Sequence, residues 1–421
     1  MKQESDWNFF EEEVNRRGFD GAKATIAMRE YYSVFDESVL EWLGKLYSHD
    51  IGGFYFSNSA RDNEYVVTEE GKFRLLPDIE STYQALRFLT SSGTIKRYSE
   101  LPGTMCNKIK EFLCSLESEE NGFFYHPQWT HEMVDSKPAR RGRDIRWAIL
   151  ISEMLSFKFP YPTAVERLAS CKDQEKSDNK IPDYLYDRER FLTYLKSFDW
   201  DNEAYYAGNA LSAQSTLINA SGLTDVAVEF LNRIQNTENG LWGTQGGYTA
   251  VNAYLKLSNF YTSYGKVIPN ADKAFETVLE CAASDEAVNT VCWQYNVWSS
   301  LDNIIKNLRA AKTEDGIETA DKLLNSLYAS LTDVINSTRK KALAFKKDDS
   351  SFSFNPNRNP QVSQGLPVTI KECNEGCVNA TLLCSAATVQ NVFRALDLGK
   401  YQIPLFGKNA FEAFISSCKI N

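Results

Sequence analysis

The chain of 421 residues has no long apolar run and no surplus of basic residues. No segment approaches the roughly 18 apolar residues that a membrane-spanning helix needs. The segment from Met1 to Asp6 lacks the apolar stretch of a secretion signal. The net charge is −10, whereas nucleic-acid binding calls for a basic face. We therefore expect a cytoplasmic protein that binds neither nucleic acid nor membrane.

Signatures of metal, nucleotide and disulfide chemistry are missing too. The nine cysteines, an odd number spread along the chain, do not form the closely spaced even set of a disulfide-stabilised domain. Cys373, Cys377 and Cys384 stand close together, but their spacing is not that of a structural zinc site. Neither a Walker loop, a Gly-x-Ser-x-Gly elbow nor a His-Glu-x-x-His element occurs. We expect reduced thiols, no metal and no cofactor.

What the sequence does contain is a segment that occurs three times in one register. Each copy begins with glutamate, an aromatic residue and leucine, and carries a glycine eleven residues after the glutamate and an aromatic residue two positions later. The copies are Glu41–Phe54, Glu111–Phe124 and Glu229–Trp242. A repeated register indicates stacked copies of one supersecondary unit. No Gly/Ser/Pro-rich linker separates them, so we expect one domain over residues 1–421.

Each copy predicts a pair of helices. In the first copy Val39, Trp42, Leu43 and Leu46 follow the spacing of an amphipathic helix, and the glycine ends it. A second, more apolar helix follows after a loop. The predicted second helices are 79–89, 145–155 and 248–260, and three weaker pairs are 191–198 with 210–220, 271–281 with 288–308, and 320–345 with 377–396.

Six such pairs predict an all-α fold, an (α/α)6-type toroid. The second helices would form an inner barrel and the first helices an outer ring. Additional capping helices are expected at about residues 6–17 and 411–418. A toroid of this kind leaves a cavity at one end, lined by loops and by the N-termini of inner helices.

The first copy resembles the repeat of the terpenoid cyclase and protein prenyltransferase superfamily. The resemblance rests on Gly52-Gly53-Phe54-Tyr55 followed by Leu76-Pro77-Asp78-Ile79-Glu80-Ser81-Thr82-Tyr83-Gln84-Ala85-Leu86. The segment Gln235–Trp242 is also similar to the Gln-Trp motif of triterpene cyclases, with one residue more. The resemblance implies the toroidal architecture, which six-hairpin glycosidases and polysaccharide lyases share.

The catalytic signatures of that superfamily are absent. Cyclases that protonate their substrate use an Asp-x-Asp-Asp element, and the most similar segment, Asp199-Trp200-Asp201-Asn202, lacks the last acid. Prenyltransferases hold zinc through Asp, Cys and a late His, whereas the histidines here are His49, His126 and His131. The resemblance therefore implies architecture and not a reaction.

Three carboxylates are candidates for acid–base catalysis. Asp78 and Glu80 stand at the start of the first predicted inner helix, and Asp144 takes the matching place in the second. Such a carboxylate either caps the helix, which contributes roughly 0.5–2 kcal/mol, or faces the cavity as a general acid or base. The sequence leaves both interpretations open.

Arginines and aromatic residues supply the candidate binding groups. Arg140, Arg143 and Arg146 lie before and within the second inner helix, where the helix N-terminus also favours an anion; the alternative is salt bridging to carboxylates. Aromatic residues near predicted loops or inner-helix starts predict an aromatic cavity wall, although each on its own also suits the core. They are Trp129, Trp147, Trp242, Tyr248, Trp293, Tyr295 and Trp298.

These features favour a carbohydrate-active enzyme, a hydrolase or lyase acting on a small neutral or acidic oligosaccharide. Asp78 or Glu80 would be the acid or base with Asp144 as partner, and Arg143 and Arg146 would clamp an anion. One alternative is an isoprenoid-handling toroid whose arginines hold a diphosphate. A second is a binding scaffold without catalysis, in which Asp78 and Glu80 serve as caps.

Overall fold

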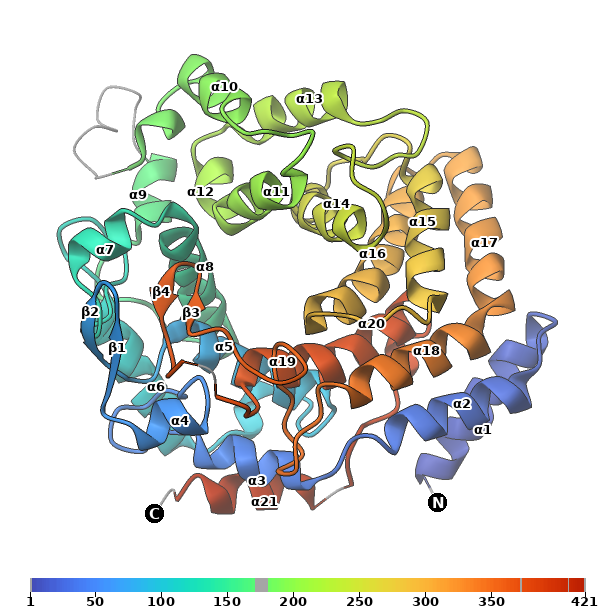
Figure 1. Ribbon diagram of the computed structural model, residues 1–421, viewed down its shortest axis with the longest axis horizontal. Helices are drawn as coiled ribbons and strands as arrows, with labels where there is room; N and C mark the ends of the chain where they lie inside the picture. The colour runs from blue at the N-terminus through green and yellow to red at the C-terminus, as the bar shows by residue number, and fades with distance from the viewer. Residues whose placement is uncertain (1, 171–180, 372, 408, 420–421) are drawn as a thin grey trace.

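The computed structural model describes residues 2–170, 181–371, 373–407 and 409–419, and its regular secondary structure is almost entirely helical (Figure 1). Two short antiparallel hairpins are the sheets of this part of the chain. They pair β1 (Tyr65–Thr68) with β2 (Gly71–Arg74) and β3 (Val362–Ser363) with β4 (Leu366–Pro367). The predicted all-α class is therefore confirmed. None of the described helices is both long and apolar enough to cross a bilayer.

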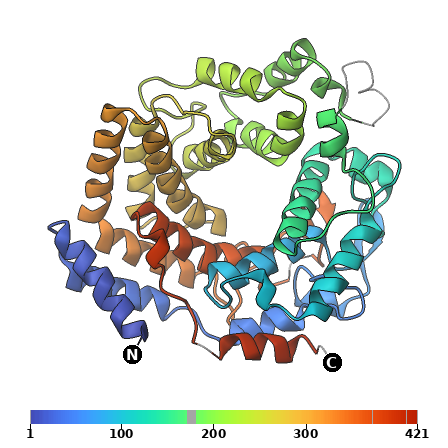
Figure 2. The same cartoon turned by 180° about the vertical axis from the view of Figure 1, so that it is seen from behind.

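Six helical segments, here called the inner helices, surround a common centre in both views (Figures 1 and 2). Each contacts the next along the chain, and α19 at the end packs against α5 at the beginning. The inner helices are α5 (Ile79–Ser91), α8 (Pro138–Met154), α11 (Ala204–Ala213), α14 (Gly247–Ser263), α16 (Val291–Ala310), and α19 (Val378–Leu382), which continues through a π-helical turn (Leu383–Ala387) into α20 (Thr388–Ala395).

The other helices lie outside them. α2 packs against α1 and α18, α10 against α13, and α15 against α16 and α18. The chain ends are helical as expected, with α21 packed against α3. The bounds of these helices are α1 (Lys2–Arg16), α2 (Gly21–Tyr32), α3 (Ser38–Lys45), α4 (Asn58–Asp62), α6 (Gly103–Leu116), α7 (His131–Asp135), α9 (Ala164–Ser170), α10 (Arg188–Lys196), α12 (Ser215–Ala220), α13 (Thr224–Ile234), α15 (Ala271–Ala283), α17 (Glu314–Ala329), α18 (Leu331–Leu343) and α21 (Ala410–Ser417).

Several predicted helix boundaries differ from those observed. The helix expected from residue 145 begins seven residues earlier, at Pro138, which suits the first helical position because proline lacks the N–H that this position leaves unpaired. The long helix expected over 320–345 is broken at Ser330 into α17 and α18. The predicted helix 210–220 is likewise divided, since α11 begins at Ala204 and ends before α12.

The repeated glycine has the same structural role in all three copies. Gly52, Gly122 and Gly240 have φ values of 99°, 70° and 67°, which disfavour any residue with a Cβ atom. A Cβ atom on each would also overlap backbone atoms of the following helical unit, at Lys108, Pro162 and Asn270 respectively. The glycine therefore turns the chain and lets the next outer segment approach closely.

A fourth copy of this turn lacks the glycine and is not recognisable in the sequence. Ser350 takes the left-handed conformation there, with φ of 64°, and Phe352 occupies the place of the repeated aromatic residue. The amide of Phe352 donates to Thr381 Oγ1 at 3.0 Å, as the amide of Phe54 donates to Thr82 Oγ1 at 3.0 Å in the first copy. These threonines stand on α19 and α5, the two inner helices that meet.

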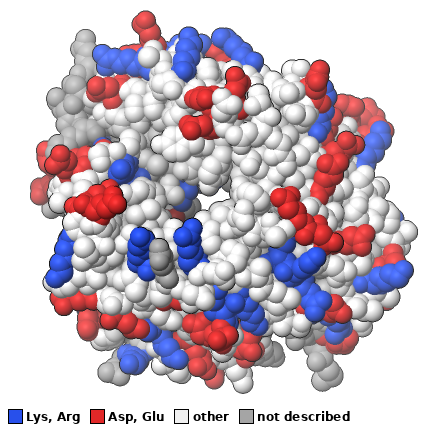
Figure 3. All heavy atoms as spheres, in the orientation of Figure 1, with Lys and Arg blue, Asp and Glu red and all other residues white. Residues whose placement is uncertain are grey.

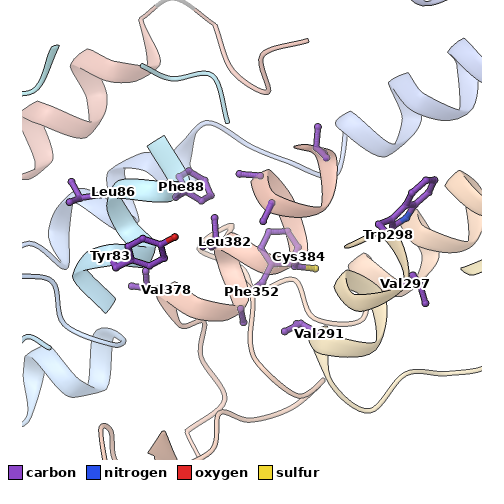
Figure 4. Close-up of a cluster of buried hydrophobic side chains, with 14 of the residues drawn as sticks. Tyr83, Leu86, Phe88, Val291, Val297, Trp298, Phe352, Val378, Leu382 and Cys384 are labelled. Carbon is purple, nitrogen blue, oxygen red and sulfur yellow. The ribbon is translucent and has the colours of Figure 1, made fainter. Parts of the chain in front are cut away.

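A continuous hydrophobic core joins these two helices to α16 (Figure 4). Side chains of all three helices converge there with Phe352 from the fourth turn. The labelled members are Tyr83, Leu86, Phe88, Val291, Val297, Trp298, Phe352, Val378, Leu382 and Cys384. Residues nearly 300 positions apart in the chain thus share one packed cluster, which fixes the last inner helix against the first.

We predict that Gly240→Ala destabilises the protein far more than Gly222→Ala. Both glycines have positive φ, 67° and 73°, but no atom lies within 4 Å of a Cβ placed on Gly222. Gly222→Ala should therefore cost only the left-handed strain, about 1–2 kcal/mol. Gly240→Ala should add roughly 1–3 kcal/mol for displacing the backbone at Asn270. Urea unfolding measures both, and equal losses would contradict the role given to close approach.

Candidate functional site

The inner helices enclose a cavity of about 530 Å³. Every inner helix contributes to its wall, and so do Pro360 and residues 362–364, which lead into and form part of the β3–β4 hairpin. The residues from the helices include Glu80, Tyr83, Gln84 and Arg87 of α5, Arg143, Arg146 and Trp147 of α8, Tyr205 and Ser212 of α11, Lys256 and Asn259 of α14, Cys292, Tyr295, Asn296, Ser299, Asp302, Asn303 and Lys306 of α16, and Asn391 and Arg394 of α20.

The cavity is rich in positive charge although the protein is acidic. Among the residues that the structure describes, its wall contains six basic side chains and two carboxylates, Glu80 and Asp302. Figure 3 shows basic side chains beside the hollow at the centre of one face. The basic residues of the wall are Arg87, Arg143, Arg146, Lys256, Lys306 and Arg394.

A buried ionic cluster, here called the Arg140 cluster, lies in the wall between α5 and α8. Arg140 is fully buried and donates to both carboxylate oxygens of Asp144, at 2.9 and 2.6 Å. Its Nη1 donates to Glu80 at 3.2 Å, and its Nη2 lies 3.8 Å from Asp78. Arg143 adds a second cation, 3.0 Å from Glu80. Two guanidinium groups thus hold three carboxylates, and α5 is tied to α8.

The pKa values of the carboxylates reflect their different shares of this positive charge. Burial raises the pKa of Asp144 to about 6, against the opposing effect of Arg140. Burial also raises the pKa of Asp78 more than Arg140 lowers it. At Glu80 burial has the same tendency, but Arg143 and Arg140 outweigh it, so its pKa lies below the usual range. Glu80 is therefore held as an anion.

Of the three predicted catalytic carboxylates only Glu80 lines the cavity. Asp78 caps α5, accepting from the amide and hydroxyl of Ser81 at 2.8 and 2.7 Å. Asp144 does not occupy the matching place in α8, because that helix begins at Pro138 and Asp144 lies in its second turn. Its side chain points into the wall toward Arg140, where helical spacing of four residues brings the two together.

The predicted arginines also differ in their access to the cavity. Arg140 is buried between the helices and does not line the cavity, whereas Arg143 and Arg146 do. Arg143 is shared between Glu80 and Asn209, 3.0 Å from each. Arg146 makes long contacts of 3.5 Å with the carbonyl of Ser212 on α11 and 3.4 Å with the hydroxyl of Ser215 at the start of α12.

Four cations of the cavity have no carboxylate within ion-pair distance in the described part of the chain. Besides Arg146, they are Arg87, Lys256 and Arg394. Burial lowers the pKa of Lys256 to about 8, with a further contribution from Arg143. Arg394 is exposed, whereas Arg87, Arg146 and Lys256 are partly buried. Because a charge removed from water without a counter-charge is costly, these three groups favour an anionic ligand.

Three polar side-chain atoms of the cavity residues also lack hydrogen-bond partners. The atoms Gln84 Oε1, Asp302 Oδ1 and Asn391 Nδ2 are buried and make no hydrogen bond to any residue that the structure describes. All three residues face the cavity. Buried polar groups are nearly always hydrogen-bonded in proteins. Two acceptors and one donor are therefore available for a ligand with several hydroxyl groups.

Five of the seven aromatic residues predicted for the cavity wall lie elsewhere. The indole N–H groups of Trp129, Trp242 and Trp298 donate within the core, to Pro367 O, Leu231 O and Thr338 Oγ1 at 2.9–3.0 Å. Tyr248 donates to Cys281 O at 2.6 Å and stacks on Trp293, with ring centroids 4.9 Å apart. None of these five lines the cavity. Their amphipathic side chains are accommodated between helices, where a carbonyl or hydroxyl satisfies the polar end.

Two of the predicted aromatic residues, Trp147 and Tyr295, do line the cavity, together with Tyr83 and Tyr205, which were not predicted. Tyr83 and Trp147 stack with centroids 4.2 Å apart and planes at 16°, and Tyr205 and Tyr295 also face the cavity. Their positions follow a helical stripe that the sequence contains. On α16 the cavity residues recur at intervals of three and four from Cys292 to Lys306, and on α5 from Glu80 to Arg87. A polar stripe on a predicted inner helix is the signal that identifies them.

Comparison with known proteins gives no family for the chain. No protein-family model matches it, and neither a curated protein nor a solved structure shows significant similarity. In the part of the chain that the structure describes, no group of three or more His, Cys, Asp or Glu residues could hold a metal ion. The functional argument therefore rests on the cavity itself.

We predict that Arg140→Met destabilises the protein by roughly 3–5 kcal/mol, because it leaves buried carboxylates without their counter-charge. Their pKa values would rise above the roughly 4 of an unfolded carboxyl, so the folded variant would hold protons that the unfolded chain releases, and it would lose stability as pH rises from about 4 through the raised pKa values. Urea unfolding at pH 5 and pH 8 measures this, and the loss should be larger at pH 8.

Two further variants complete that test. Adding Asp144→Asn to Arg140→Met should recover part of the stability, since one unpaired carboxylate is removed. Arg188→Met breaks an exposed pair with Glu229 and should cost less than about 1 kcal/mol. A loss independent of pH, or equal to that of Arg188→Met, would show that the Arg140 cluster does not stabilise the wall.

Proposed function

We propose that the protein is a lyase of small acidic oligosaccharides, built on an α/α toroid and acting in the central cavity. The observation that carries the proposal is the set of cavity cations without carboxylate partners, beside a stacked aromatic pair and unpartnered amides. The toroid assignment draws support from the order of the inner helices, each against the next and α19 against α5. The repeated turn supports the same assignment.

The composition of the cavity favours a sugar over an isoprenoid. Sugar rings stack on aromatic faces such as Trp147, and their hydroxyl groups suit amides such as Gln84 and Asn391. A hydrocarbon chain in the same space would leave these buried polar atoms without partners, which costs about 1–3 kcal/mol for each. A uronate or a similar acid on the sugar would meet Arg146 and Lys256.

The carboxylates favour elimination over hydrolysis. A glycosidase needs two carboxyl groups that face the substrate, one able to give a proton and one able to act as base or nucleophile. Glu80 is held by two arginines and by Ser363, whose hydroxyl donates at 2.9 Å. Asp302 is paired with Lys306 at 2.7 Å. β-Elimination from a uronate requires instead a base near the C5 proton and cations that stabilise the carboxylate.

Glu80 and Asp302 are each paired with a basic side chain, Arg140 and Lys306 respectively. This also favours one other candidate, a protein that binds the same acidic sugar without catalysis. In that case the cavity would supply affinity and selectivity alone. The two candidates share a ligand and differ in whether a product forms.

We predict that uronate-containing oligosaccharides raise the melting temperature of the protein and that prenyl diphosphates do not. A ligand at 100 times its dissociation constant should stabilise the fold by about 2.7 kcal/mol. Elimination is then followed by the ultraviolet absorbance of the new C4=C5 double bond. Binding without this product would favour the non-catalytic candidate, and stabilisation by diphosphates alone would contradict the proposal.

Arg146→Gln and Lys256→Gln should each weaken binding of the acidic sugar. Loss of one partner of a buried ion pair costs about 2 kcal/mol or more, which corresponds to an affinity roughly 30-fold lower. Arg233→Gln is the matched control, because it removes an equal charge from the exposed face of α13. If Arg233→Gln weakened binding as much as the two cavity variants, net charge and not the cavity would explain the affinity.

A further inference from the structure

We infer that Lys256 is a reactive amine that forms an imine with the carbonyl carbon of an oxo acid bound in the cavity, while Arg146 holds the acid group. An oxo acid is a small molecule that has both an aldehyde or ketone carbonyl and a carboxylate, such as the open-chain form of a reducing uronate. The inference goes beyond the proposed function, because imine formation requires neither a glycosidic bond nor an elimination.

Two arginines of α8 approach α11, the inner helix that lies between α8 and α14 (Figure 1). Arg143 donates to Asn209 Oδ1 at 3.0 Å, and Arg146 lies 3.5 Å from the carbonyl oxygen of Ser212. Arg143 is also paired with Glu80, whereas Arg146 has no carboxylate within ion-pair distance among the described residues. Arg146 is therefore the arginine of this pair that can hold the anion of a ligand.

Lys256 of α14 reaches the same face of α11 from the other side. A Cβ atom placed on Gly208 would lie 3.2 Å from the Cβ atom of Lys256, so the lysine stem passes close over this glycine. The Nζ atom lies 5.8 Å from the ring centroid of Tyr205. The α11 residues that contact the three cations are spaced by three and four positions and share one helix face. They are Tyr205, Gly208, Asn209 and Ser212.

The amine of Lys256 is free of partners that would keep it from reacting. Among the described residues, no carboxylate lies within ion-pair distance of it and no oxygen accepts a hydrogen bond from it. Burial and the charge of Arg143 lower its pKa from 10.5 to about 8. At pH 7 its neutral, nucleophilic fraction is then roughly 300 times that of a lysine with the ordinary pKa.

Two other lysines show that the position of Lys256, and not its pKa, distinguishes it. Burial lowers the pKa of Lys341 to about 8 as well, but Lys341 lies outside the cavity and donates to two backbone carbonyls at 3.1 and 3.3 Å. Lys306 does line the cavity, but it is paired with Asp302 at 2.7 Å. In the described part of the chain, Lys256 is the lysine that lines the cavity without a carboxylate partner.

The groups that face Lys256 leave it as the titrating group near pH 8. Burial raises the pKa of Tyr205 to about 12 and also raises the pKa of the Cys292 thiol. Glu80, the one carboxylate near it among the described residues, is bound by two arginines and by Ser363. α15 also packs against α14 but contributes no described residue to the cavity wall. The facing groups are Glu80 of α5, Arg143 and Arg146 of α8, Tyr205 of α11 and Cys292 of α16.

The reaction is a condensation that balances without an oxidant or a reductant. The neutral amine attacks the carbonyl carbon, and the second electron pair of the C=O bond moves to the oxygen, which receives one proton from the nitrogen. The nitrogen lone pair then forms the C=N bond, and the oxygen leaves as water with the second proton from the nitrogen. The nearby cations stabilise the negative charge that develops on the carbonyl oxygen.

The first test traps the imine with cyanoborohydride, which reduces it to a stable secondary amine, and locates the modified lysine by peptide mass spectrometry. The full-length protein is incubated at pH 8 with limiting glyoxylate, an oxo acid. We expect Lys256 to be modified before Lys306, Lys341 and the exposed lysines. Modification that is spread evenly over the lysines, or that is absent from Lys256, overturns the inference.

The second test examines the role of Arg146 by comparing glyoxylate with glycolaldehyde, a neutral aldehyde. Arg146→Gln should slow the modification of Lys256 by glyoxylate roughly 30-fold and its modification by glycolaldehyde far less, since only glyoxylate has an anion to hold. Equal losses with both aldehydes would contradict this role. The matched control is Lys266→Arg, since Lys266 is paired with Asp225 outside the cavity, and this variant should react like the wild type.

The third test measures the neutral fraction of each lysine by labelling with trace acetic anhydride as a function of pH. Labelling of Lys256 should rise up to about pH 8 and then level off, whereas that of exposed lysines should continue to rise toward pH 10. Lys341 should label slowly at every pH, because it is buried outside the cavity. A Lys256 that labels like the exposed lysines would overturn the inference.

The outcomes separate the inference from the proposed function. If Lys256 is trapped but no uronate oligosaccharide binds or is cleaved, the proposed function fails and the inference stands. If the protein cleaves such an oligosaccharide but Lys256 is not modified ahead of the other lysines, the inference fails and the proposed function stands. Equal reactivity of Lys256 in the folded and the urea-unfolded protein would also overturn the inference, because the cavity would then have no part in it.

Discussion

The buried guanidinium of Arg140 is the interaction on which the inner wall depends. It holds Asp144 on its own helix and Glu80 and Asp78 on the neighbouring helix α5. A charge removed from water is tolerated only where it is paired and hydrogen-bonded. Three carboxylates can be buried between α5 and α8 because Arg140 and Arg143 form ion pairs with them. Trp129 covers the guanidinium, whose carbon lies 4.9 Å from the ring centroid.

This pairing within the wall also determines the charge of the cavity. Asp78 and Asp144 are buried in the Arg140 cluster and do not face the cavity. Glu80 does reach the cavity, and Arg140 and Arg143 neutralise its charge. The remaining cations of the inner helices therefore face the cavity with little opposing charge. An acidic protein can in this way present a basic cavity, because the two carboxylates that line it, Glu80 and Asp302, are each paired with a cation.

The β3–β4 hairpin, which lines part of the cavity, is hydrogen-bonded to the Arg140 cluster. Ser363 donates to Glu80 at 2.9 Å, and Gln364 accepts from Asn209, which in turn accepts from Arg143. A loop about 280 residues away in sequence from α5 thereby completes the hydrogen bonding of Glu80. Sequence separation of this size explains why the contact has no local signature.

Much of the helical content follows from local pattern. The helices beginning at Ile79, Gly247 and Ala271 lie within one residue of the predicted starts, because a cap or a glycine stands beside an apolar stripe. The start of α8 at Pro138 was not predicted, since the polar run from Arg140 to Asp144 gives no apolar stripe. Because the predicted helix began too late, Asp144 was placed at the helix start, as a counterpart of Asp78, whereas it lies in the second turn of α8.

The candidate site was predictable only in part for the same reason. Glu80, Arg143 and Arg146 were identified as functional candidates and do line the cavity, whereas Arg140, Asp78 and Asp144 lie in the wall. Residue type alone does not separate these groups, because an arginine that binds a ligand and one that neutralises a buried carboxylate look alike in sequence. Trp242 and Trp298 were misplaced because an indole suits a core and a sugar equally well.

The sequence by itself determined the helical class, the repeated turn and the glycine that turn requires, because these depend on spacing and on backbone conformation within a few residues. Only the tertiary structure decided which side of each inner helix meets the cavity and which charges cancel within the wall. That decision depends on contacts between helices distant in the chain, such as α19 with α5 and Arg140 with Glu80. Burial and pairing, which no local pattern encodes, separate structural charge from charge available to a ligand.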